Sequence, residues 1–393
     1  MKKIIWLCFF LSACGGGGGG AAPSVPAASS VAVSSVPNVV PLYAAPSSVN
    51  VNILLASATI CAPGTSNCQT INNLLVDTGS YGVRILKSVL TIPLAQVNGT
   101  GGAALSECAP FASGYAWGQV ATADFKMGGE VASSVPIQVI DDSSSPSPAV
   151  PAGCTGVSIG NAASIGANGI IGIGVFSHDC GQYCASSANN NTYFECPASG
   201  CVSLAEPYSL QVRNPVPSFA DNNGILITLP QIPSTGAPNV SGTLTFGIGT
   251  QGNNSLGMAT VIPLDASGNF TTVLNGTSFS GSFVDSGSNM MLFQDGALPI
   301  CAGGLGYCPA STQQLGATLK NTASGTPSVS VSFSVANTTA LVQNGNAVYN
   351  NLAGSSATVG TFDWGLPFFF GRTIYFAISG MNTPAGQGPY VAF

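Results

Sequence analysis

Charge is scarce in this chain, because only 6% of its 393 residues are Asp, Glu, Lys or Arg. Long exposed helices depend on Glu, Lys and Arg, so few such helices are expected. A single histidine and the lack of any Cys-x-x-Cys pair remove the usual donor sets of a zinc site, and no phosphate-binding loop with its lysine occurs. The formal net charge of −6 argues against nucleic acid as a partner.

The residues that are abundant indicate β structure. Gly, Ser, Thr, Asn and Val dominate, and short runs of Val, Ile, Thr and Phe alternate with Gly, Asn and Pro. Such runs predict strands separated by turns. Residues 48–393 are too many for one ordinary domain, which favours two β lobes. No motif calls for a cofactor or a metal, so neither is expected.

The N-terminus has the features of a secretory signal. Two lysines precede a short apolar stretch that ends in Leu-Ser-Ala-Cys, and that stretch is too short to span a bilayer. This ending resembles a bacterial lipobox, which implies a signal over residues 1–13 and a lipidated Cys14. Glycine after Cys14 then favours the outer membrane of a Gram-negative cell envelope. An ordinary cleaved signal with an incidental cysteine is the alternative.

Residues 14–47 are interpreted as a linker. After Cys14 they begin with six glycines, continue in Ala, Pro, Ser and Val, and contain no charged side chain. This composition is typical of a flexible tether between an anchor and a folded body.

Ten cysteines remain after Cys8 and Cys14, an even number that predicts disulfides in an exported chain. Close spacing makes two pairs plausible: Cys61–Cys68 and Cys301–Cys308. Four more form a cluster: Cys180, Cys184, Cys196 and Cys201. If this cluster pairs internally, Cys108 is left with Cys154. A metal site is the competing interpretation of the cluster.

Two short segments nearly repeat each other. Residues 74–80 read LLVDTGS and residues 282–288 read SFVDSGS, so each apolar run ends in Asp, a hydroxyl residue, Gly and Ser. Asp77 and Asp285 are two of only fourteen acidic residues. Two carboxyl groups held face to face cannot both stay ionised, so one becomes an acid and the other a base.

These paired turns resemble the signature of the pepsin-like aspartic proteases, and weaker matches follow in the order of that family. They are residues 113–118, 123–129, 168–174, 242–247, 364–369 and 372–376. The resemblance implies an all-β, bilobal fold with a cleft between two barrel-like lobes. The predicted lobes are 48–250, with a Cys-rich insertion at about 177–222, and 251–393. The variant GLPFFFGR at 365–372 is most similar to an uncharacterised family of bacterial lipoproteins.

The same resemblance assigns roles around the dyad. Asp77 and Asp285 would be catalytic, while Thr78 and Ser286 would hydrogen-bond across to the opposite turn. Gly79 and Gly287 allow the turns to approach, and Ser80 and Ser288 can donate to the carboxyl groups. The glycines expected beneath the dyad are Gly172 and Gly365.

Two further residues are expected near substrate. Tyr115 is the candidate flap residue, against the alternative of a partly buried strand tyrosine. Arg84 occupies the position where the family commonly has a tryptophan that bonds the flap tyrosine. An arginine there would stabilise an ionised carboxylate or bind a substrate carboxyl group, unless it lies unpaired at the surface.

The leading hypothesis is a membrane-tethered aspartic endopeptidase that acts on peptide or protein substrates as a monomer. The runner-up is a non-catalytic envelope protein that binds peptide or polysaccharide in the same cleft. A structural surface protein is the third possibility. The charge-free linker at 14–47 offers no basic segment that would resemble the inhibitory prosegment of this family.

Overall fold

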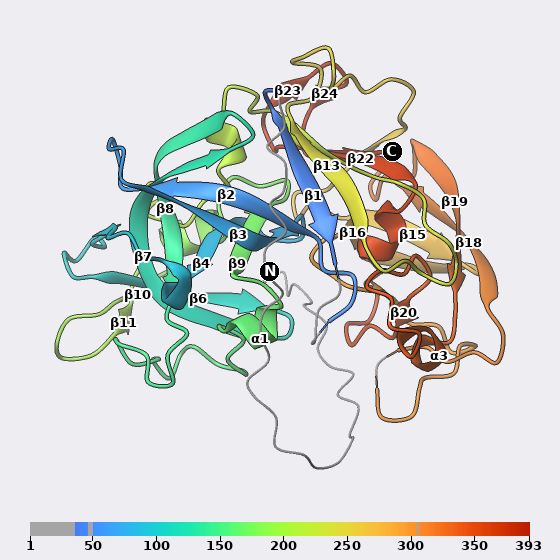
Figure 1. Ribbon diagram of the computed structural model, residues 1–393, viewed down its shortest axis with the longest axis horizontal. Helices are drawn as coiled ribbons and strands as arrows, with labels where there is room; N and C mark the ends of the chain where they lie inside the picture. Colours follow the sequence, from blue (N-terminus) through green and yellow to red (C-terminus); the bar gives the residue numbers. More distant parts are fainter. Residues whose placement is uncertain (1–35, 46–49, 305) are drawn as a thin grey trace.

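The computed structural model describes residues 36–45, 50–304 and 306–393. Two β lobes lie side by side, one formed by the blue-to-green part of the chain and the other by the orange-to-red part (Figure 1). Helices in the described residues are short: α1 (Ala162–Ile165), α2 (Gln182–Ser186), α3 (Thr338–Val342), η1 (Lys87–Val89), η2 (Val216–Ser218) and η3 (Leu366–Phe369). None of them is long and apolar enough to cross a membrane. The expected bilobal all-β fold is confirmed.

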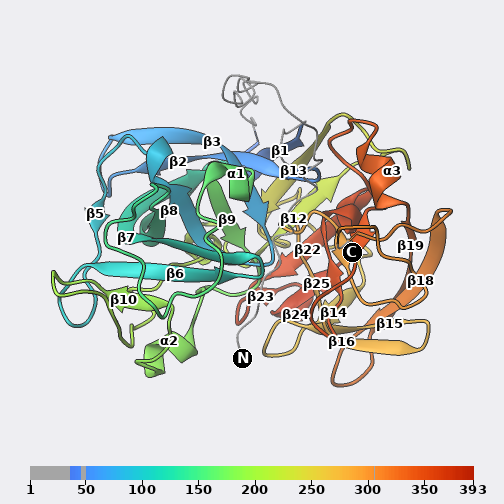
Figure 2. The same cartoon turned by 90° about the horizontal axis from the view of Figure 1, so that it is seen from below.

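A closed ring of six strands forms the N-terminal lobe. These strands are β2 (Leu55–Cys61), β3 (Cys68–Asp77), β4 (Tyr81–Leu86), β7 (Gly114–Met127), β8 (Glu130–Ile140) and β9 (Gly169–Ile173). The ring closes because the long strand β7 pairs with both β8 and β2. Four further strands extend from its edge: β5 (Ala95–Gln96), β6 (Leu105–Phe111), β10 (Tyr193–Glu195) and β11 (Val202–Ser203). The hairpin β6–β7 projects toward the other lobe (Figure 2).

A central sheet joins the lobes. In spatial order its strands are β1 (Val39–Ala44), β13 (Val240–Phe246), β12 (Gly224–Leu229), β22 (Arg372–Ala377), β25 (Tyr390–Ala392) and β14 (Val261–Pro263). Figure 2 shows β12 and β22 between the two lobes. Strands from both predicted lobes therefore share one sheet, which fixes the lobes relative to each other.

Strand β1 corrects the predicted linker. Residues 14–47 were expected to form a tether, yet Val39–Ala44 pair along their whole length with β13. Val40, Leu42 and Ala44 alternate into the core, so the period of two that marks a half-buried strand is present. Composition alone hid this segment, because it contains a proline and its flanking residues are rich in Pro, Ser and Ala.

The C-terminal lobe is built on a seven-stranded sheet. In spatial order its strands are β19 (Ser328–Val335), β18 (Gln313–Lys320), β15 (Phe270–Leu274), β16 (Thr277–Val284), β21 (Asp363–Trp364), β17 (Met291–Leu292) and β20 (Ala353–Gly354). A hairpin of β23 (Asn382–Thr383) and β24 (Gly386–Gln387) lies apart. Aromatic side chains fill the core beneath β21, where the rings of Phe362 and Trp364 stack at 4.2 Å between centroids.

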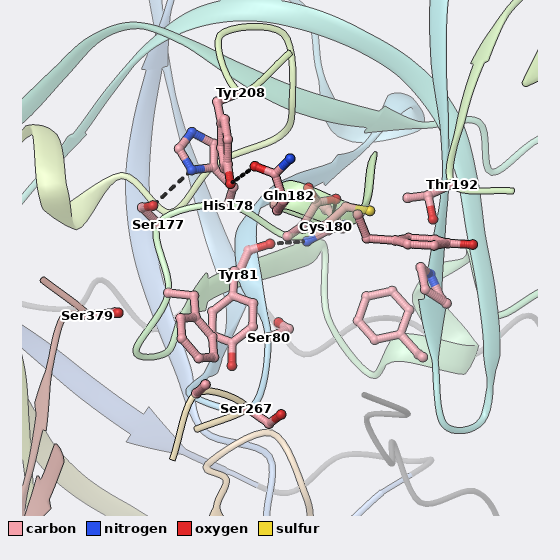
Figure 3. Close-up of a pocket in the computed structure, with 18 residues that line it drawn as sticks. Ser80, Tyr81, Ser177, His178, Cys180, Gln182, Thr192, Tyr208, Ser267 and Ser379 are labelled. Carbon is pink, nitrogen blue, oxygen red and sulfur yellow. Dashed lines mark hydrogen bonds and ion pairs between the residues drawn. The ribbon is translucent and has the colours of Figure 1, made fainter. Parts of the chain in front are cut away.

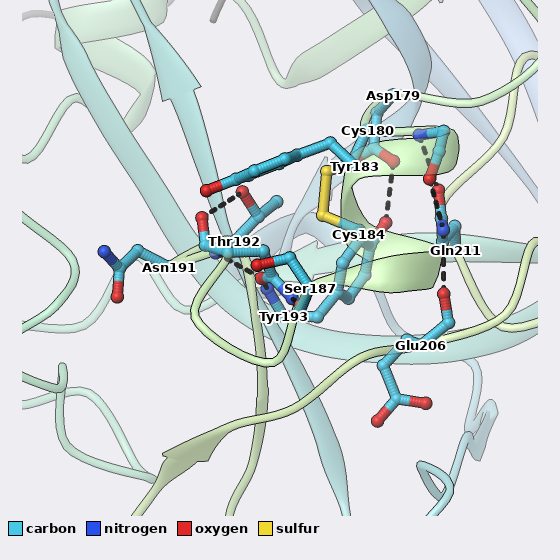
Figure 4. Close-up of a disulfide and its surroundings, with 12 residues drawn as sticks. Asp179, Cys180, Tyr183, Cys184, Ser187, Asn191, Thr192, Tyr193, Glu206 and Gln211 are labelled. Atoms are coloured by element: carbon cyan, nitrogen blue, oxygen red, sulfur yellow. Dashed lines mark hydrogen bonds between the residues drawn. A yellow bond between two sulfur atoms is a disulfide. The ribbon is translucent and has the colours of Figure 1, made fainter. Parts of the chain in front are cut away.

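The ten expected cysteines form five disulfides, which confirms the predicted framework. The pairs are Cys61–Cys68, Cys108–Cys154, Cys180–Cys184, Cys196–Cys201 and Cys301–Cys308. The metal interpretation of the four-cysteine cluster is therefore wrong. Figure 4 shows Cys180–Cys184 at α2, inside the segment 177–222. This segment is attached to the first lobe through β10, which pairs with β6.

Candidate active site

Asp77 and Asp285 stand at the ends of equivalent strands. Asp77 is the last residue of β3, and Asp285 directly follows β16. Each of these strands pairs in parallel with a short strand of its own lobe, β3 with β9 and β16 with β21. Asp77 lies opposite Gly172 of β9. The Asp285 N–H donates to the Trp364 carbonyl of β21 at 3.0 Å. Both lobes thus build the same frame around their aspartate.

Thr78 and Ser286 hold the two turns together. The Thr78 N–H donates to Ser286 Oγ at 3.2 Å, and the Ser286 N–H donates to Thr78 Oγ1 at 2.9 Å. Each hydroxyl then donates into the opposite strand, Thr78 to the Val284 carbonyl at 3.3 Å and Ser286 to the Val76 carbonyl at 2.7 Å. The cross-loop hydrogen bonds expected from the sequence are present, and both side chains are buried.

The glycines of the turns let the two carboxyl groups meet. The Gly79 N–H is 2.8 Å from Asp77 Oδ1 and 3.1 Å from Asp285 Oδ1, and the Gly287 N–H donates to Asp285 Oδ1 at 2.7 Å. A Cβ on Gly79 would lie 2.5 Å from the Asp285 carboxyl, and one on Gly287 would lie 2.6 Å from Asp77 Oδ1. Any side chain at either position would therefore push the carboxyl groups apart.

The outer oxygen of each aspartate is bound by a serine. Ser80 Oγ donates to Asp77 Oδ2, and Ser288 Oγ lies 3.0 Å from Asp285 Oδ2. The inner Oδ1 atoms face each other, and the side chains of Asp77 and Asp285 hydrogen-bond directly. Both serines thus occupy the positions that the sequence predicts.

The surroundings of Asp285 favour its protonated form. Burial raises the pKa of Asp285 well above its usual range, the negative Asp77 beside it raises it further, and Asp363 adds a third contribution. A carboxyl group so close to a second one is harder to ionise, which is the arrangement that proton sharing requires.

Gly172 and Gly365 lie where the sequence predicts, beneath the turns. A Cβ on Gly172 would be 2.7 Å from the Tyr81 nitrogen and 2.8 Å from Ser80 Oγ. One on Gly365 would be 2.8 Å from the Ser288 carbonyl oxygen. Both glycines therefore permit close support of the serines that bind the aspartates.

A third carboxyl group lies in the site that sequence reasoning missed. Asp363 Oδ2 is 2.6 Å from Ser288 Oγ, and Asp363 is only 1% exposed. Burial raises the pKa of Asp363 well above its usual range, and the nearby Asp77 raises it further. The sequence did carry one indication of this residue: Asp363 is an acid between two large aromatic residues, Phe362 and Trp364, in a chain that has few acids.

A cavity of about 720 Å³ opens beside the dyad (Figure 3). Its wall comes from the first Asp turn, the hairpin strand β6, the insertion and two loops of the second lobe: Ser80, Tyr81, Pro110, Phe111, residues 176–183, Ala266, Ser267 and Ser379 are among the lining residues. The carboxyl-bearing residues Asp77 and Asp285 are 0% exposed. Tyr81 packs edge-on against Phe176, and burial followed by the two aspartates raises its pKa, which places its ring beside the dyad.

The lining of this cavity carries little net charge. Burial, followed by the repulsion of Glu107, raises the pKa of Asp179 well above its usual range. His178 is neutral near pH 7, because burial and then the charge of Arg213 lower its pKa to about 4. Its Nδ1 lies 2.8 Å from Ser177 Oγ.

Arg84 lines the cavity, but its carboxylate partners are not those of the dyad. It is 3% exposed, and its Nη2 lies 2.6 Å from Glu107 Oε1 and 3.1 Å from Asp179 Oδ2. Neither sequence expectation, an arginine on the dyad or an unpaired surface arginine, describes this position. The guanidinium therefore links β4 to the hairpin strand β6 through Glu107 and to the insertion through Asp179. No sequence spacing indicated those partners.

Tyr115 is not where the flap prediction requires it. Its side chain packs against the cluster of Cys108, Trp117, Cys154 and Phe194, and it does not line the cavity. Tyr115 shares the hairpin face of Cys108 and Trp117, and its ring lies close to Gly156. Pro110 and Phe111 of β6 line the cavity instead. Cys14 and the signal over 1–13 lie outside the described residues.

The described residues contain no group of three or more His, Cys, Asp or Glu side chains placed to hold a metal ion. The site is therefore built from three carboxyl groups, two serines and the hydrogen bonds of two turns.

The fold and the paired turns define a bilobal structure of the aspartic proteinase class. Among solved structures, the aspartic proteinase from Irpex lacteus matches with a TM-score of 0.51 and 14% identity, over 90% of this chain and 96% of that one. At this identity the likeness shows the fold. The chain belongs to the family described as protein of unknown function (DUF3443), whose model matches residues 34–393. No curated protein sequence matches the chain.

Proposed function

We propose that this protein is an aspartic endopeptidase. The observation that carries the proposal is the contact between the carboxyl groups of Asp77 and Asp285, each fixed by a backbone N–H of its own turn and by a serine hydroxyl. Such a pair supplies an acid and a base to one reacting centre. The fold, which the aspartic proteinase from Irpex lacteus shares, supports this proposal without carrying it.

In the proposed reaction Asp77 and Asp285 act together on a water molecule. Asp77, as the base, takes one proton from the water, whose oxygen attacks the carbonyl carbon of the peptide bond. Asp285, which retains the shared proton, donates it to the carbonyl oxygen. The tetrahedral diol then collapses: Asp77 gives the proton taken from the water to the amine nitrogen, the C–N bond breaks, and one diol hydroxyl returns its proton to Asp285 as the carboxylic acid product forms. No covalent enzyme intermediate forms.

The cavity favours an uncharged substrate side chain next to the scissile bond. The aromatic rings of Tyr81, Phe111 and Phe176 form the part of its wall nearest the first Asp turn and the hairpin. Arg84 is neutralised by its partners, and His178 is neutral near pH 7. A charged side chain would lose its hydration in this cavity without finding a free partner, which costs several kcal/mol, on the order of what burying an unpaired ion requires.

A mixed peptide library, incubated from acidic to neutral pH, tests the proposal. Cleavage by the wild type, its inhibition by a statine-type peptide, and its loss in Asp77→Asn and Asp285→Asn are the expected results. Asp295→Asn is the matched control, because this aspartate is partly exposed and accepts a hydrogen bond only from its own turn. Cleavage that survives in both dyad variants would refute the proposal.

A non-catalytic binding protein is the second candidate, and one observation favours it. Asp77 and Asp285 are 0% exposed, so neither carboxyl group meets solvent in this conformation. A protein that binds peptide or polysaccharide beside the dyad would keep its ligand in Asp77→Asn and Asp285→Asn. An enzyme would lose turnover in the same variants. A structural surface protein would show neither activity nor ligand binding.

We further propose that the protein is a monomeric lipoprotein of the cell envelope, held at the outer membrane of a Gram-negative bacterium. The support is the signal-like sequence over 1–13 and the lipobox-like ending before Cys14. Acyl chains on Cys14 would anchor the chain stably to a membrane surface. Expression of Cys14→Ala should move the protein to the soluble fraction. Unchanged membrane association of that variant would contradict the anchor.

A further inference from the structure

Ser288 stands between two carboxyl groups, and this arrangement is the starting point. Its Oγ lies 3.0 Å from Asp285 Oδ2 and 2.6 Å from Asp363 Oδ2. A hydroxyl has one hydrogen, so it can donate to only one of two acceptors. The second contact is a hydrogen bond only if the other carboxyl group is protonated and donates to Ser288 Oγ.

The N-terminal lobe lacks this third group. Strand pairing places Ile170 opposite Leu75, two residues before Asp77, and Asp363 opposite Phe283, two residues before Asp285. The same position of the repeated frame is thus apolar beneath Asp77 and acidic beneath Asp285. The asymmetry distinguishes the two aspartates chemically.

The surroundings of Asp363 favour its neutral form. It is 1% exposed, and its Oδ1 has no hydrogen-bond partner among the described residues. The titratable groups that act on it are Asp77 and Asp285, both acidic, and no described cation pairs with it. An ionised carboxylate there would be a buried charge beside two other acids.

We propose that Asp363 is a positioning residue of the dyad, which donates its proton to Ser288 Oγ and thereby turns the Ser288 hydrogen toward Asp285 Oδ2. The three carboxyl groups then hold two protons, one on Asp363 and one shared by Asp77 and Asp285. Asp285 then accepts a hydrogen bond from Ser288 at Oδ2 and shares the second proton with Asp77. The expected effect on kcat rests on the proposed function. The number of protons held by the three carboxyl groups does not depend on that function.

Two variants separate this role from a merely structural one. Asp363→Asn keeps a donor to Ser288 Oγ and imitates the protonated acid. Asp363→Ile copies the residue of the first lobe and removes the donor. The expected result is a kcat for the Asn variant within about threefold of the wild type, and a kcat for the Ile variant about tenfold lower at unchanged KM, the loss of one oriented hydrogen bond.

A structural role predicts the opposite order, because Ile fills a buried apolar frame and Asn buries an amide. Equal kcat values for the Ile variant and the wild type, or equal losses in both variants, would therefore overturn the proposal. The double variant Asp363→Ile with Ser288→Ala should be no slower than Ser288→Ala alone, since Asp363 acts through that hydroxyl. Additive losses would also overturn it.

Carbon-13 NMR of the aspartate carboxyl carbons counts the protons without any activity. The resonance that disappears in Asp363→Asn identifies Asp363 in the wild type. It should keep the chemical shift of a protonated carboxyl at pH 6, about two units above the ordinary aspartate pKa. An ionised Asp363 at that pH overturns the inference. If the wild type cleaves no peptide at any pH, the proposed function fails, and this spectrum alone decides the role of Asp363.

Discussion

Replacing Arg84 tests how the hairpin, the cavity and the insertion are held together. Its guanidinium is buried and lies 2.6 Å from Glu107 Oε1 and 3.1 Å from Asp179 Oδ2. Arg84→Met keeps most of the side-chain volume but removes the cation from Glu107 and from Asp179, the carboxyl group whose pKa burial raises. Breaking a buried ion pair from one side costs about 3–5 kcal/mol, so a loss of that size is expected in the free energy of unfolding at pH 7.

The loss should depend on pH in a defined direction. Acid neutralises the orphaned carboxyl groups, so at pH 4 only lost hydrogen bonds remain, on the order of 1–2 kcal/mol. Urea unfolding at both pH values measures the difference. The double variant Arg84→Met with Glu107→Gln should recover part of the loss at pH 7. Arg372→Met is the control, because Arg372 bonds the Phe368 carbonyl and lies over its ring rather than beside an acid.

An Arg84→Met loss that is equal at pH 4 and pH 7, or that matches the Arg372→Met loss in its pH dependence, would refute the ion-pair account. The same variant should also raise KM for peptide substrates, because Arg84 positions Asp179 and the hairpin strand that line the cavity.

Two further predictions follow from the described contacts. Thr78→Val and Ser286→Ala each remove buried cross-loop hydrogen bonds, so each should lower the free energy of unfolding, measured in urea, by about 1–3 kcal/mol. The double variant should lose less than the sum of the two single losses, because the two hydroxyls hydrogen-bond in one network. Strictly additive losses would contradict this coupling. Burial raises the folded-state pKa of three carboxyl groups: Asp179, Asp285 and Asp363. Because the unfolded chain releases these protons near pH 4, their contribution is complete below that pH and is lost as pH rises through the folded values. Unfolding free energy from pH 4 to pH 8 should therefore fall, and a steady rise over that range would contradict these protonation states.

The sequence predicted the features that depend on short, local patterns. Two nearly identical Asp turns predicted equivalent frames for Asp77 and Asp285, and the resemblance to the pepsin-like proteases predicted that the two turns meet. The cysteine spacings anticipated the disulfides for a similar reason, since Cys61–Cys68 and Cys301–Cys308 close loops of only a few residues. Local chemistry of this kind needs no knowledge of distant partners.

Features that depend on distant pairing were missed. Strand β1 forms because Val39–Ala44 pair with β13, some two hundred residues later in the chain. The composition of β1 does not indicate that partner. Arg84 meets Glu107 and Asp179 only once the hairpin and the insertion have folded against β4. Tyr115 was assigned by its distance from the first Asp turn, but that distance does not fix its contacts, and its side chain packs against Cys108 and Trp117 instead.

Proton sharing between residues 77 and 285 is tested most directly by the pH dependence of kcat/KM for one internally quenched peptide. The account predicts a bell-shaped profile with an acid and a base limb, and a loss of at least about a thousandfold at its maximum when Asp285 is replaced by Asn. A profile governed by a single ionisation, or one that persists in Asp285→Asn, would contradict the proposed mechanism.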